Sequence, residues 1–210
     1  MSQQITVLGA SKGVGQRTVE QALQKGWKVV ALSRHLDLPQ VPNLVQIQGS
    51  ATNPTDLQKA IEGSNAVIVA IGTNTSTKPT TLYSEAANAL VQTFKPHKLQ
   101  VPLLVVTGFG AGNSKAYQGL IAKLIFNLFL KAVYADKTRM EKIIAGQLDN
   151  WIIVRPARLT DDASTGHYQV ITDYRDDMHI SKISRGNVAH FLLEQAQNPT
   201  MLRQFPALSD

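Results

Sequence analysis

The chain has 210 residues, of which 43% are hydrophobic and 17% are charged, so it can bury the core of one folded domain and extended disorder is excluded. It contains no cysteine, which excludes disulfides, thiolate-bound metals, iron–sulfur clusters and a cysteine nucleophile. The net charge of +6 comes from scattered basic residues, so we expect a solvated surface and no nucleic acid partner. Because neither a secretory signal nor an apolar membrane span is evident, we expect a cytoplasmic protein with no stable membrane insertion.

Short apolar segments alternate with segments of helical periodicity. In chain order, the predicted strands are residues 5–8, 28–32, 44–47, 66–70, 103–106 and 151–154. The predicted helices are residues 13–25, 54–62, 80–95, 116–147 (with a break) and 185–197. Strands that are apolar along their whole length are typical of a parallel sheet covered on both faces. The order predicts an α/β fold, a doubly wound (Rossmann) mostly parallel sheet, in a single domain over residues 1–210.

The pattern changes after Val154. Residues 155–182 are polar and rich in turns, with a strand-like segment at 168–172, and we expect 157–182 to form a small cap on the substrate side of the sheet. The very apolar segment 120–133 leaves several interpretations open: a buried helix, a substrate wall, a dimer face or a membrane-surface contact. We expect a monomer or a weak homodimer.

A glycine-rich turn, Gly9-Ala10-Ser11-Lys12-Gly13-Val14-Gly15, joins the first predicted strand to the first predicted helix. Gly9 permits a tight turn, while Gly13 and Gly15 allow the backbone to approach a diphosphate and the helix to pack closely on the strand. The helix N-terminus adds free N–H groups and the positive end of the helix dipole. The turn therefore predicts a dinucleotide site.

The end of the second predicted strand indicates which dinucleotide is bound. NAD sites usually carry Asp or Glu there, but this chain has Ser33-Arg34-His35, and the nearest acid is Asp37. Arg34 is suited to bidentate binding of a 2′-phosphate, and Lys12 would add a second positive charge. The sequence therefore favours NADP(H) over NAD(H).

Several other segments carry a resemblance to a known family. In order along the chain they are 65–69, 71–73, 79–81, 84–85, 136–140 with Lys142, 151–156, 165–168, 180–181 and 190–191. With the glycine turn, they make the chain similar to the atypical NAD(P)H-binding branch of the short-chain dehydrogenases/reductases. Within that branch, the chain resembles the NADPH-dependent flavin reductase/biliverdin reductase B family over nearly its whole length.

The resemblance implies transfer of hydride from NADPH to a flavin or a linear tetrapyrrole. It implies that the turn holds the diphosphate and that Arg34 holds the 2′-phosphate. It also implies that further residues, listed next, contact the cofactor between its adenine and its nicotinamide. Together with Lys12 from the turn, the implied cofactor-binding residues are Gly9, Ser11, Gly13, Val14, Gly15, Arg34, Ser50, Ala51, Ile71, Gly72, Thr73, Thr107, Lys137 and Pro156. The chain departs from the family pattern at Ser50, Gly108, Lys137 and Arg158, and in its G-x-x-x-G-x-G turn.

The catalytic candidates are Lys137 and Thr107. Ordinary short-chain dehydrogenases use Tyr-x-x-x-Lys, but here Tyr134 precedes Lys137 by three residues, which argues against a tyrosine acid. Lys137 is interpreted as a ribose ligand, with a solvated helix lysine as the alternative.

The candidates for substrate binding lie beyond the fifth and sixth predicted strands. They are Gly108 and Phe109, the latter for ring stacking, and Arg158. Arg158 would pair with an anionic group of the substrate or, equally well, with Asp161 or Asp162. The spacing of the histidines indicates no metal site.

The function predicted from the sequence is an NADPH-dependent reductase of flavins, and also of biliverdin, with a small-molecule substrate. A non-catalytic NADP(H) sensor that acts through a protein partner remains the alternative, because the catalytic tyrosine is missing.

Overall fold

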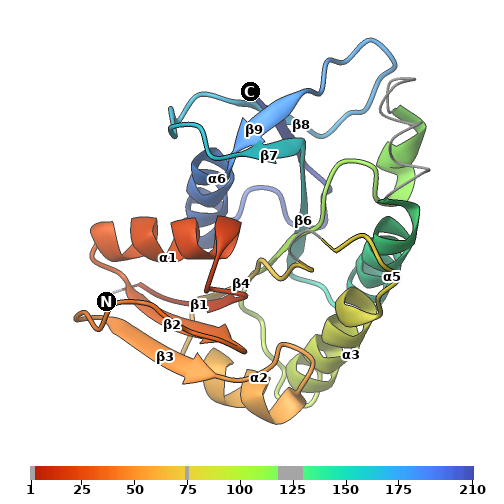
Figure 1. Cartoon of the computed structure of the whole chain (residues 1–210). Coiled ribbons are helices and arrows are strands. Elements are labelled where there is room, and N and C mark those ends of the chain that lie inside the picture. The colour runs from red at the N-terminus through yellow and green to blue at the C-terminus, as the bar shows by residue number, and fades with distance from the viewer. Residues whose placement is uncertain (1–2, 74–75, 118–129) are drawn as a thin grey trace.

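The computed structural model describes residues 3–73, 76–117 and 130–210, and its centre is an eight-stranded sheet (Figure 1). The strand order is β3-β2-β1-β4-β5-β6-β10-β8, and every neighbouring pair is parallel except β10 and β8. The strands are β1 (Gln4–Leu8), β2 (Lys28–Ser33), β3 (Leu44–Gln48), β4 (Ala66–Val69), β5 (Leu103–Val106), β6 (Trp151–Pro156), β8 (Gln169–Ile171) and β10 (Ala207–Ser209). The predicted doubly wound, mostly parallel sheet is confirmed.

Helices cover both faces of this sheet. Figure 1 shows α1 and α6 on one side of it and α2, α3 and α5 on the other. Their bounds, with that of the 3-10 helix η1, are α1 (Gly13–Gln24), α2 (Pro54–Ile61), α3 (Leu82–Phe94), η1 (Gly112–Tyr117), α5 (Lys131–Gln147) and α6 (Arg185–Gln197). The predicted break within 116–147 and most of the apolar segment 120–133 lie outside the described residues.

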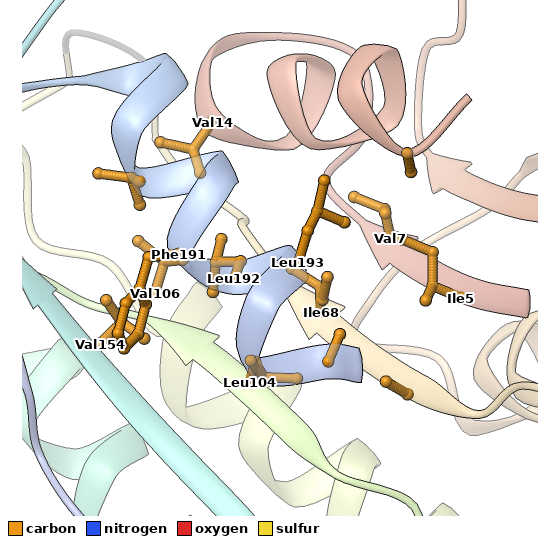
Figure 2. Close-up of a cluster of buried hydrophobic side chains, with 14 of the residues drawn as sticks. Ile5, Val7, Val14, Ile68, Leu104, Val106, Val154, Phe191, Leu192 and Leu193 are labelled. Atoms are coloured by element: carbon orange, nitrogen blue, oxygen red, sulfur yellow. The ribbon is translucent and has the colours of Figure 1, made fainter. Parts of the chain in front are cut away.

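Each central strand contributes side chains to two cores. Ile5 and Val7 of β1 pack with α1 and α6 in one core, where Figure 2 shows them beside Ile68 and Leu193. Leu8, which points the other way, packs under α2 and α3. Because successive side chains of a strand face opposite sides, two buried faces require the continuous apolar runs seen in the sequence.

Three short strands were not predicted: β7 (Arg158–Thr160), β9 (Lys182–Ser184) and β10. β7 and β9 pair in parallel as a separate two-stranded sheet, so residues 157–182 begin and end beside one another. Asn187 of α6 accepts hydrogen bonds from the backbone N–H groups of Thr165 and Gly166, both at 3.0 Å, and thereby fixes the intervening loop. In the described residues, no helix is long and apolar enough to cross a bilayer.

Candidate active site

The glycine turn leaves β1 in a conformation that only glycine adopts without strain. Gly9 has φ +83°, and its N–H donates to Leu32 O of β2 at 2.8 Å. A Cβ at Gly9 would lie 2.7 Å from Ala70 O, and a Cβ at Gly15 would overlap with Gly9 O. The two glycines therefore let α1 begin directly against the ends of β1 and β4.

The first turn of α1 begins without a side-chain cap. Lys12 is the N-cap residue, and among the described residues its side chain makes no capping hydrogen bond. Gly13 has φ +61°, and a Cβ placed on it would meet Arg185 only at ordinary contact distance, 3.7 Å. An anionic diphosphate suits this opening, because N–H donors and the positive end of the helix dipole face it.

Gly15→Ala is expected to lower the free energy of unfolding by about 1–3 kcal/mol and to weaken dinucleotide binding, because the added methyl overlaps a backbone oxygen. Chemical denaturation and titration of NADPH fluorescence measure the two effects. The matched control is Gly146→Ala in α5, where an added Cβ meets nothing within 4 Å; helix propensity predicts a gain of up to about 1 kcal/mol there. Equal behaviour of the two variants would contradict the packing argument.

The tip of β2 lies against the glycine turn. Ser33 Oγ donates to Ser11 Oγ at 3.1 Å, and both Lys12 and Arg34 are exposed on the segments that this bond joins. The end of β3 joins the same edge, because the N–H of Gly49 donates to Ser33 O at 3.0 Å. The predicted phosphate-binding residues therefore belong to neighbouring loops at the carboxyl edge of the sheet.

The predicted adenine side is built by the loop between β3 and α2. Ser50 donates its N–H to Asp56 Oδ2 at 2.9 Å, and its hydroxyl bonds to Thr52 Oγ1 at 2.8 Å. Ala51 is buried beside it. The Ser50 hydroxyl thus supports its own loop, and its predicted contact with adenine stays a prediction.

The segment after β4 contains three of the predicted residues. Ile71 and Thr73 are half-buried, and Gly72 between them is exposed. Thr73 bonds to the hydroxyl of Tyr83 on α3, which fixes the end of the segment against a helix. The segment extends from the same edge of the sheet as the glycine turn, since the Ala70 N–H donates to Leu8 O at 2.8 Å.

Lys137 and Thr107 meet at the carboxyl end of β5. Lys137 Nζ donates to Thr107 O at 2.6 Å and lies 4.6 Å from the centroid of the Tyr134 ring. Burial lowers the pKa of Lys137 to about 8, although the negative charge of Glu141 opposes that change. Pro156 is buried at the end of the adjacent strand β6 and accepts the Phe109 N–H at 2.9 Å. The interpretation of Lys137 as a solvated surface lysine is therefore wrong.

Tyr134 lies beside Lys137 at the carboxyl end of β5, although its spacing in the sequence argued against such an arrangement. A Cβ on Gly108 would lie 2.7 Å from the Tyr134 hydroxyl, so the glycine leaves room for the phenol beside Thr107. The three-residue spacing brings the two side chains together, since positions i and i+3 of a helix are neighbours. Burial, reinforced by Tyr83 and Glu141, raises the pKa of Tyr134 to about 12, which is unfavourable for an activated tyrosine.

A buried ion pair that the sequence analysis missed lies behind Thr107. Arg155 donates to both carboxylate oxygens of Glu141, at 2.7 and 3.1 Å, and Thr107 Oγ1 donates to the same carboxylate at 2.7 Å. The two charged side chains are only 2% and 3% exposed. A Cβ on Gly112 would overlap this pair, so the glycine-rich 108–112 loop closes directly over it.

The predicted substrate residues lie on the rim of this region. Phe109 packs edge-on against Tyr174, with ring centroids 5.9 Å apart. Arg158 is exposed at the start of β7, and the two acids proposed as its partners pair elsewhere, Asp161 with Arg185 and Asp162 with Lys182. A cleft of about 500 Å³ lies beside the rim and is lined by Asn113, Tyr117, Thr172, Asp173, Tyr174, Gln204 and Phe205.

The described residues contain no group of three or more His, Asp or Glu side chains that could hold a metal ion. The fold and the glycine turn define a dinucleotide-binding Rossmann protein. Residues 9–199 match the model of the NAD(P)H-binding family, and the chain belongs to that family. NAD(P)H is therefore its cofactor, and the resemblance drawn from the sequence is confirmed at this level.

Solved structures with the same fold include several oxidoreductases. ChuY, an anaerobilin reductase from Escherichia coli O157:H7, is 25% identical, with a TM-score of 0.74 over 98% of this chain and 96% of ChuY. SP1627 of Streptococcus pneumoniae TIGR4, a proposed NADH-flavin reductase, is 22% identical, with a TM-score of 0.79 over the full length of both chains. A short-chain dehydrogenase/reductase from Veillonella parvula DSM 2008 in complex with NADP is 17% identical, with a TM-score of 0.83 over 100% of this chain and 95% of that one.

Proposed function

We propose that the protein is an NADPH-dependent reductase that transfers hydride to flavins, with linear tetrapyrroles such as biliverdin as a second class of acceptor. The observation that carries the proposal is the half-buried Lys137 side chain, whose ammonium donates to the Thr107 carbonyl where β5 and β6 end side by side. That is the edge of the sheet at which Rossmann proteins hold their reactive ring. The reductases among the structural neighbours support the same class of reaction.

Bound NADPH supplies the hydride from its nicotinamide ring. The glycine turn and α1 would bind the diphosphate, and the Lys137 ammonium would hold the hydroxyls of the nicotinamide ribose. Thr107 and Pro156 form the wall against which the ring is oriented, and the Glu141–Arg155 pair keeps the Thr107 side chain in place. The contribution of the protein is therefore proximity and orientation of two stacked rings.

The acceptor side favours a flat aromatic molecule. Phe109, Tyr117 and Tyr174 form an edge-to-face aromatic cluster at the rim, and the last two also line the 500 Å³ cleft. A flavin ring needs no proton from the protein, because its reduced form exchanges protons with water. A linear tetrapyrrole needs a proton on a pyrrole nitrogen, which solvent water beside the exposed Arg158 would supply.

The second candidate function is a non-catalytic NADP(H) sensor. It is favoured by the raised pKa of Tyr134, the tyrosine that lies one helical turn before Lys137. Purified protein mixed with NADPH and FMN distinguishes the two functions. Oxidation of NADPH above the rate without protein supports the reductase. Tight NADPH binding without oxidation of NADPH by FMN, FAD, riboflavin or biliverdin would support the sensor.

Arg34→Ala is expected to weaken NADPH binding by about tenfold or more and to leave NADH binding within about twofold, because it removes the charge assigned to the 2′-phosphate. Fluorescence titration of both nucleotides measures the ratio. His35→Ala, the neighbouring exposed residue, is the control and should change neither affinity. An equal loss for NADH and NADPH in Arg34→Ala would remove the assignment of Arg34 to that phosphate.

The remaining expectations belong to this proposal. We propose a single Rossmann domain whose segment 157–182 covers the acceptor. The lack of cysteine suits a reducing compartment, and the cytoplasm is the proposed location. A monomer or weak homodimer is proposed for the assembly.

A further inference from the structure

Arg185 lies over the glycine turn although it is 172 residues away in sequence, the difference between positions 185 and 13. Its Nε and Cδ are 3.7 and 3.9 Å from the point where a Cβ on Gly13 would stand. Its side chain is 28% exposed, so the guanidinium is neither buried in the core nor fully solvated. A positive group at this place faces the same opening as the N–H groups of α1.

The backbone that carries Arg185 is held firmly. Arg185 is the first residue of α6, whose N-cap Ser184 accepts the Asn187 N–H at 3.0 Å. Gln21 of α1 donates to Gly186 O at 3.0 Å, which ties the start of α6 to α1. Only the side chain of Arg185 is therefore free to exchange partners.

The present partner of Arg185 is a weak competitor for it. Asp161 accepts from Arg185 Nη1 at 2.9 Å, but the Asp161 side chain is 77% exposed. An ion pair with so solvated a carboxylate contributes about 0–1 kcal/mol. A diphosphate on the N-terminus of α1 offers more negative charge and several acceptor oxygens, and guanidinium binds such groups in a bidentate manner.

We propose that Arg185 is a diphosphate-binding residue of the dinucleotide site and that the diphosphate competes with Asp161 for its guanidinium. The inference rests on NAD(P)H binding and not on the identity of the hydride acceptor. Cofactor binding then releases Asp161, which lies just after β7 in the segment proposed to cover the acceptor. The neighbouring pair of that segment, Lys182 with Asp162 at 2.8 Å, is unaffected by the exchange.

The test is a double-substitution cycle read out by NADPH and NADH affinity. Arg185→Ala should raise both dissociation constants by the same factor, about tenfold or more, because a hydrogen-bonded charge is lost from a part common to both nucleotides. Asp161→Asn should lower both by about two- to fivefold, because a competitor worth up to about 1 kcal/mol is removed. The variant with both substitutions should behave like Arg185→Ala alone.

Asp162→Asn is the matched control, since it removes the adjacent ion pair of the same segment and should leave both affinities unchanged. If Arg185 and Asp161 only stabilised the fold, both single substitutions would weaken binding or neither would change it, and either result would overturn the inference. Asp161→Asn decides the question even if Arg185→Ala folds poorly, because Asp161 is exposed. A wild-type chain that binds neither nucleotide would overturn the cofactor assignment itself, and this inference with it.

Discussion

Glu141→Met is expected to lower the free energy of unfolding by about 3–5 kcal/mol, because it leaves the Arg155 guanidinium buried without its anionic partner. Arg155 is 2% exposed, and its two hydrogen bonds to Glu141 are its only contacts with an acid among the described residues. The substitution also removes the acceptor of the Thr107 hydroxyl. Denaturant unfolding followed by circular dichroism measures the loss.

A substitution of the partner residue, Arg155, tests whether an unpaired buried charge causes that loss of stability. Arg155→Met should cost about as much, and the chain with both substitutions should lose less than the sum of the two, since no unpaired charge is then left in the core. Glu20→Met breaks the surface pair with Arg17, whose side chains are 39% and 51% exposed, and should change stability by no more than about 0.5 kcal/mol. Strict additivity of the two buried substitutions would show that charge burial is not the cause.

Much of the fold is encoded in local patterns of sequence. The six longer strands were predicted because most of them carry a continuous apolar run, which two covered faces require. The short strands β7, β9 and β10 were missed because three residues carry no measurable period. Ala207 and Leu208 of β10 are fully buried, yet they form a strand only because β6 offers its open edge.

The candidate site likewise contains features that local sequence predicts and features that only the tertiary structure reveals. The glycine turn is local, so its spacing alone predicted a dinucleotide site. The Glu141–Arg155 pair joins a helix to the following strand, and Arg185 reaches Gly13 from a distant part of the chain. Without the topology of the sheet, nothing in the sequence marks these residues. The sequence prediction rejected Tyr134 because it precedes Lys137 by three residues and not four, although positions i and i+3 of a helix are neighbours.

Arg155 and Lys137 are connected through one carboxylate. Glu141 binds Arg155 directly and favours the charged form of Lys137 electrostatically, while its hydrogen bond with Thr107 fixes the residue whose carbonyl Lys137 contacts. Removing Glu141 therefore lowers the pKa of Lys137 further. The stability of the fold and the charge of Lys137 thus depend on the same side chain.

Lys137→Met is expected to weaken the binding of NADPH and NADH alike by about 10- to 100-fold, because it removes charged hydrogen bonds to the ribose that both nucleotides share. In the wild type, affinity should fall as the pH rises through about 8, where Lys137 loses its proton, and the variant should lack this dependence. Fluorescence titration between pH 6.5 and about 9.5 measures this dependence. The range includes the lowered pKa of Lys137 but stays below the ordinary pKa of a lysine. Lys142→Met, on the exposed side of α5, is the control and should behave like the wild type.

The stability of the same variant provides an independent measurement. The pKa of Lys137 is about 8 in the folded chain and 10.5 ordinarily, so between these values the unfolded chain holds more protons. Raising the pH through that window therefore stabilises the folded wild type relative to Lys137→Met, by up to roughly 3 kcal/mol in total. Below pH 8 the variant should be the more stable chain, because its methionine replaces a buried charge without the desolvation penalty. A difference in stability between the two chains that stayed constant from pH 7 to pH 10 would mean that Lys137 is solvated. That result would contradict both its lowered pKa and its proposed contact with the ribose.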